Sequence, residues 1–81
     1  MPTLALNLRL RRELISAILA RLEAQGMNNK QMAEQLSIAH PRAVDLRELR
    51  AERFSLDALV ILAQHAGLNV RLRATRPYAI R

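Results

Sequence analysis

The chain has 81 residues, the size of one small domain with a modest core. It contains no cysteine, which excludes a disulfide framework, a thiol nucleophile and a thiolate metal site. No run of about 18 apolar residues exists, and the N-terminus does not follow the pattern of a secretory signal. We therefore expect no membrane span and a cytoplasmic location.

The formal net charge of +6 suits a polyanionic partner such as double-stranded DNA. The excess is terminal, because residues 1–12 and 70–81 carry arginines and no acid, whereas residues 13–69 hold six basic and seven acidic side chains. Only Phe54 and Tyr78 are aromatic, which argues against a single-strand binder built on base stacking. Charge alone thus does not locate a binding surface.

Leucines alternate with other residues from Thr3 to Leu10, and this period of two predicts a strand with one buried face. The period changes between Arg12 and Gln25, where apolar residues recur at intervals of three and four and predict an amphipathic helix. Gly26 supplies a stop for that helix. The apolar stripe consists of Leu14, Ile15, Ile18, Leu19 and Leu22.

Residues 28–46 predict two short helices joined by a tight turn. Asn28 is a good N-cap, and Gln31 is placed to complete a capping box. Proline is tolerated only in the first turn of a helix, so Pro41 requires a new helix to begin near His40. The expected helices are Asn29–Leu36 and His40–Leu49. This arrangement is that of a helix-turn-helix, whose second helix can enter a major groove.

A last helix is expected after a charged connection at residues 50–53. Ser55 is its N-cap, Phe54 and Leu59 form a candidate hydrophobic staple, and Gly67 ends it. Beyond it, alternating Val70, Leu72 and Ala74 predict a second strand. Because an isolated strand is not stable, the two terminal strands are expected to pair, within one chain or between two.

Two blocks of sequence at matching spacing carry a resemblance to a known family. They are Leu36-Ser37-Ile38-Ala39-His40-Pro41-Arg42-Ala43-Val44-Asp45-Leu46 and Phe54-Ser55-Leu56-Asp57. They resemble the Xre/Cro, or lambda-repressor-like, helix-turn-helix family, and more closely its antitoxin-like branch that accompanies RelE/HigB-type toxins. Ser37 stands at the family's turn glycine and is expected to adopt a positive φ. Leu49 replaces the glycine after the third helix.

With the strand predictions, the expected fold is mainly α: a four-helix lambda-repressor-like helix-turn-helix domain with short terminal β-strands. The expected organisation is an N-terminal strand or arm (1–11), a DNA-binding domain (12–67) and a C-terminal strand and tail (68–81). We expect a homodimer whose terminal strands form a two-fold symmetric sheet. Two half-sites about one helical turn apart would then supply specificity.

The predicted DNA-contacting residues are Asn29, Lys30, Ala39, His40, Arg42, Val44 and Asp45. Arg42 could fork onto guanine or clamp a phosphate, and His40 could bond a base edge. Asn29 and Lys30 could hold a phosphate, although Lys30 is equally compatible with a solvated charge. Asp45 could accept from cytosine, but an ion pair with Arg42 or Arg47 is favoured.

The leading functional interpretation is a sequence-specific repressor, and the resemblance implies control of its own operon and neutralisation of a partner toxin. The alternative is a protein-interaction module whose helix-turn-helix has lost DNA binding. No enzyme activity, cofactor or metal is expected. His40 and His65 are the only histidines and belong to different helices, and no glycine-rich phosphate loop exists.

Overall fold

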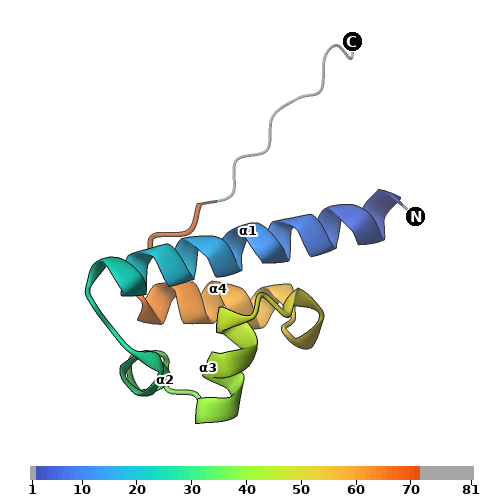
Figure 1. Cartoon of the computed structure of the whole chain (residues 1–81). Coiled ribbons are helices and arrows are strands. Elements are labelled where there is room, and N and C mark those ends of the chain that lie inside the picture. The colour runs from blue at the N-terminus through green and yellow to red at the C-terminus, as the bar shows by residue number, and fades with distance from the viewer. Residues whose placement is uncertain (1, 72–81) are drawn as a thin grey trace.

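A computed structural model describes residues 2–71 of the chain, with side chains from residue 7 onward, and its regular structure there is helical (Figure 1). The elements follow in the order α1 (Pro2–Ala24), α2 (Asn29–Leu36), α3 (His40–Arg47), the 3-10 turn η1 (Ala51–Arg53) and α4 (Leu56–His65). α4 runs along α1, and α2 and α3 lie below this pair in the view of Figure 1. The mainly helical prediction is confirmed.

The predicted strand from Thr3 to Leu10 is wrong, because these residues belong to α1. A step of two residues turns a helix by about 200°, so alternating leucines fall into pairs four residues apart. Leu8 accordingly packs against the core, whereas Leu10 is 39% exposed. Leucine, alanine and arginine also favour a helix over a strand. The boundary expected between residues 11 and 12 therefore falls inside α1.

The second predicted strand lies largely outside the described residues, since Leu72 and Ala74 fall beyond Arg71. Asn69 to Arg71 have no regular secondary structure. Its expected partner at the N-terminus is helical, so the two-fold sheet built from both terminal strands cannot form as predicted.

One apolar core joins all the helices. α4 begins as expected, with the Ser55 Oγ accepting a hydrogen bond of 3.1 Å from the Ala58 N–H. Phe54 and Leu59, the predicted staple pair, are both buried in this core. The buried cluster comprises Ile15, Ile18, Leu22, Met32, Leu36, Leu46, Ala51, Phe54, Leu59, Leu62, Ala63 and Ala66. α2 and α3 are thus held by the same core that joins α1 to α4.

Arg11 ties α1 to the segment that follows α3. Its guanidinium donates to the backbone carbonyls of Ala51 at 3.3 Å and Phe54 at 3.1 Å. Part-buried hydrogen bonds from a charged donor are among the stronger ones. The charged connection expected at residues 50–53 is therefore an ordered turn, η1, which anchors the far end of α3.

Candidate nucleic-acid interface

α2 and α3 form the predicted two-helix motif. The capping box is confirmed: the Asn28 side chain accepts from the Gln31 N–H at 2.8 Å, and the Gln31 side chain accepts from the Asn28 N–H at 2.9 Å. Ser37 adopts the predicted left-handed conformation, with φ 59° and ψ 46°. The Ile38 N–H donates to the Ala33 carbonyl at 3.0 Å, which closes the turn.

The turn leads directly into α3, which begins at His40 after Ala39, its N-cap residue. α3 ends at Arg47, two residues earlier than expected, and Leu49 then takes a left-handed φ of 58°. This conformation turns the chain away from the helix axis toward η1.

α3 has a buried inner side and an accessible outer side. Ala43, Asp45 and Leu46 are buried, whereas His40, Pro41, Arg47 and Glu48 are exposed and Val44 is half-buried. The outer residues are spaced by three, four and seven, so they share one face of the helix. We call His40, Pro41, Val44, Arg47 and Glu48 the outer face of α3. This face is what the motif offers to a partner.

The predicted contacts on α2 lie in its first turn. Lys30 is exposed and Asn29 is half-buried. The N–H groups of these residues belong to the first turn of a helix, where backbone donors have no partner within the helix. Ala39 and His40 are exposed at the corresponding end of α3. Four of the predicted residues therefore lie at the N-terminal ends of two packed helices.

Arg42 does not belong to the outer face. Its guanidinium carbon lies 4.1 Å from the centroid of the Phe54 ring, and Nη1 donates to the Arg53 carbonyl at 2.8 Å. A cation over an aromatic face is attracted to the ring's electrons. Arg42 thus binds the side of α3 to η1, and a contact with a base would require it to give up these partners.

Asp45 is 7% exposed and faces inward. Its carboxylate accepts a hydrogen bond from Arg50 at 3.0 Å, and Arg53 lies 3.7 Å away. The favoured ion pair is present, but the predicted partners, Arg42 and Arg47, are wrong. A residue buried behind two arginines cannot reach a cytosine in the groove, so its direct contact with a base is not supported.

Arg47 was missed by the sequence interpretation, although its spacing was informative. It follows His40 by seven residues and Val44 by three, which places it on the same helical face. Its guanidinium lies 3.6 Å from a Glu23 carboxylate oxygen and 3.8 Å from the Met32 sulfur, and its side chain is 39% exposed. Arg47 therefore supplies a cation at the C-terminal end of the outer face.

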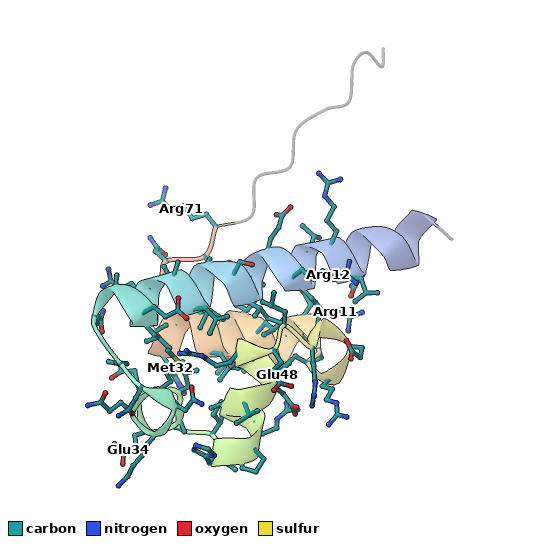
Figure 2. All side chains as sticks on the ribbon, in the orientation of Figure 1. Arg11, Arg12, Met32, Glu34, Glu48 and Arg71 are labelled. Carbon is teal, nitrogen blue, oxygen red and sulfur yellow. The ribbon has the colours of Figure 1, made fainter. Side chains whose placement is uncertain are left out.

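The remaining charges are not gathered on this surface. Figure 2 shows Arg71 on the side of α1 that faces away from α3 and Arg12 on α1 itself, whereas Glu34 and Glu48 lie beside α2 and α3. The motif therefore presents Lys30 and Arg47 together with two carboxylates, although Arg47 pairs with Glu23 and Glu48 pairs with Arg50. Electrostatic attraction to a polyanion at this surface would depend on these few cations.

Other kinds of site find little support in the described part of the chain. Between residues 2 and 71 no group of three or more His, Asp or Glu side chains could hold a metal ion. Nor do the helices described there include one long and apolar enough to cross a membrane.

Comparison with known proteins supports the motif. A family model described as a helix-turn-helix domain matches residues 2–75. Neither a curated protein nor a solved structure matches the chain.

Proposed function

Because the chain belongs to the helix-turn-helix domain family, we propose that it is a sequence-specific DNA-binding regulator that places α3 in a major groove. The observation that carries this proposal is the division of α3 into a buried inner side and an accessible outer face. A helix is about 10–12 Å across with its side chains, which matches a major groove about 12 Å wide.

The roles of the individual residues follow from their places. Lys30 and the first-turn N–H groups of Asn29 and Lys30 bind a phosphate, which sets the docking angle. His40 offers a hydrogen bond to a base edge, and Val44 offers an apolar contact of the kind that thymine methyl groups accept. Ala39 lies at the start of α3 and has no bulky side chain to keep the backbone from the DNA.

Two of the arginines take different roles. Arg47 meets the phosphates at the far end of the outer face. Arg42 orients α3 through Phe54 and η1 and contacts the DNA backbone only if its present hydrogen bond opens. Asp45 supports the helix from behind.

The biological role proposed is repression by a homodimer in the cytoplasm. Support for autoregulation of a toxin–antitoxin operon, and for a cognate toxin as a second partner, comes from the resemblance of residues 36–57 to the antitoxin-like branch. A toxin gene beside this one would separate an antitoxin from a lone regulator.

A second function is favoured by one observation. Arg42 is already bonded to Arg53 and stacked on Phe54, and Glu34 and Glu48 stand beside the motif (Figure 2). A helix-turn-helix with few free cations could instead bind another protein through the same outer face. Salt dependence discriminates the two, because DNA binding weakens steeply with ionic strength.

The test is a gel shift with the DNA upstream of the gene, at several salt concentrations and with scrambled competitor. Lys30→Ala should weaken binding to all sequences alike and reduce the slope of log K against log salt by about 1, because one phosphate contact is lost. Arg12→Ala is the matched control, since it removes one positive charge from an exposed position on α1, outside the helix-turn-helix.

The control variant should bind as the wild type does. Equal effects of Lys30→Ala and Arg12→Ala would mean that only net charge matters and that α2 does not contact the DNA. A protein that shifts no DNA at low salt would leave the interaction module as the better hypothesis.

A further inference from the structure

A groove with an apolar floor runs between α1 and the first half of α4. Its volume is about 600 Å³. Its floor consists of Leu10, Leu14, Leu56, Val60 and Val70. Leu10 and Val70 remain 39% and 37% exposed. Apolar side chains that gather in one groove, instead of being scattered singly, indicate an interaction surface.

We propose that this groove is the homodimer interface and that α1 of a second copy fills it in an antiparallel arrangement. The two apolar stripes then meet, with Leu10 of each copy entering the groove of the other. This inference rests on the proposed function in one respect: the binding of two half-sites is the reason for the chain to dimerise.

The charges around the groove favour a copy of this chain as the occupant. Its rim carries Glu13, Asp57 and Arg71, and Arg9 lies 3.6 Å from the Glu13 carboxylate, so charges of both signs surround the groove. Charges of both signs give the phosphates of nucleic acid or of an anionic membrane no concentrated positive patch to bind. α1 carries Arg9 beside Leu10, so an antiparallel second α1 brings Arg9 of each copy toward the carboxylates of the other.

The shape of the molecule favours the same occupant. α1 has 23 residues and α4 has 10, which correspond to about 34 Å and 15 Å of helix. The N-terminal turns of α1 extend beyond α4 (Figure 1). An antiparallel neighbour along α1 would pack along this extension.

The position of the groove is compatible with DNA binding. Its lining comes from α1, α4 and residues 70 and 71, with no residue of α2 or α3. Two copies joined through it therefore leave both outer faces of α3 accessible. A two-fold axis through such an interface relates the two recognition helices to two symmetric half-sites.

The experiment measures the mass of the full chain in solution by light scattering over a range of concentrations without DNA. Leu10→Glu and Val70→Glu each place a carboxylate on the apolar floor, where contact with a second copy would remove it from water. Each should raise the dimer dissociation constant at least about tenfold. Ile61→Glu is the matched control, because Ile61 lies on α4, is 52% exposed and does not line the groove.

Circular dichroism and thermal unfolding show whether each variant is folded. The proposal holds if the wild type and Ile61→Glu are dimers and a folded Leu10→Glu or Val70→Glu is monomeric. A monomeric wild type, or groove variants as dimeric as the control, would overturn it. If the groove variants become monomeric as expected but the dimeric wild type binds no DNA, the result counts against the proposed function and not against the interface.

Discussion

Two residues other than glycine hold a left-handed backbone at the ends of the motif helices. Ser37 follows α2 with φ 59°, and Leu49 follows α3 with φ 58°. Side chains with a Cβ disfavour this region by about 1–2 kcal/mol per residue. The structure keeps both because the turns they make, into α3 and into η1, are required by the packing on either side.

Ser37→Gly should therefore stabilise the protein by about 0.5–1 kcal/mol. The gain is smaller than the relief of strain, because glycine also increases the entropy of the unfolded chain. Urea unfolding monitored by circular dichroism measures it. Ser37→Ala keeps the Cβ and serves as the control, which should show no gain. A destabilised Ser37→Gly would mean that the Ser37 side chain contributes more than its backbone conformation costs.

At the scale of the element, α4 packs mainly against α1 and has one buried and one exposed side. Leu59 has no exposed surface and belongs to the core that contains residues of α1, α2 and α3. Two residues later on the same helix, Ile61 is 52% exposed. One turn of α4 thus contains a buried and an accessible residue of the same size.

Leu59→Ala should lower the free energy of unfolding by about 2–5 kcal/mol, because it removes buried methyl groups and leaves a cavity. Ile61→Ala removes a similar side chain from the surface and should change stability by less than about 0.5 kcal/mol. Chemical denaturation of both variants gives the comparison. Equal losses would show that the core is not organised around Leu59.

For the N-terminal part of α1, hydrophobic periodicity alone predicted a strand where the structure has a helix. Four leucines at alternate positions satisfy both a strand with one buried face and a helix with two apolar stripes. The helix prevails here because residues 12–24 already form one, and extending it costs far less than starting a strand. The bounds of α2, in contrast, were predicted correctly because its capping box lies within three residues of its start.

For the whole molecule, the proposed dimer has a geometric consequence. Two α3 helices related by a two-fold axis should bind half-sites whose centres are about 10–10.5 base pairs apart, or a multiple of that spacing. Inserting about 5 base pairs between the half-sites places one of them on the opposite side of the duplex. Affinity measured by gel shift should then fall toward that of a single half-site.

An insertion of one full helical turn returns both half-sites to the same side of the duplex and should recover part of the affinity. The same insertions placed outside the operator are the control and should have no effect. Binding that is indifferent to a half-turn insertion would show that each copy binds DNA independently.

Local chemistry in the sequence was sufficient to determine the helix-turn-helix. The cap at Asn28, Pro41 in the first turn of α3 and the cap at Ser55 each act within a few residues, so their effects are visible without the fold. The exchange of the turn glycine for Ser37 likewise predicted a positive φ, which the structure has. The burial of Leu59 was predicted from its spacing relative to Phe54 in the hydrophobic staple.

Only the tertiary structure decided which polar side chains remain free. Arg42, Asp45 and Arg11 are engaged by η1 and the residues beside it, and η1 is brought to them by packing between segments far apart in the chain. The groove beside α1 arises in the same way, from the meeting of α1, α4 and residue 70. Hydrophobic spacing in the sequence shows which face of a helix is apolar, whereas the partner that each side chain meets depends on how whole helices pack.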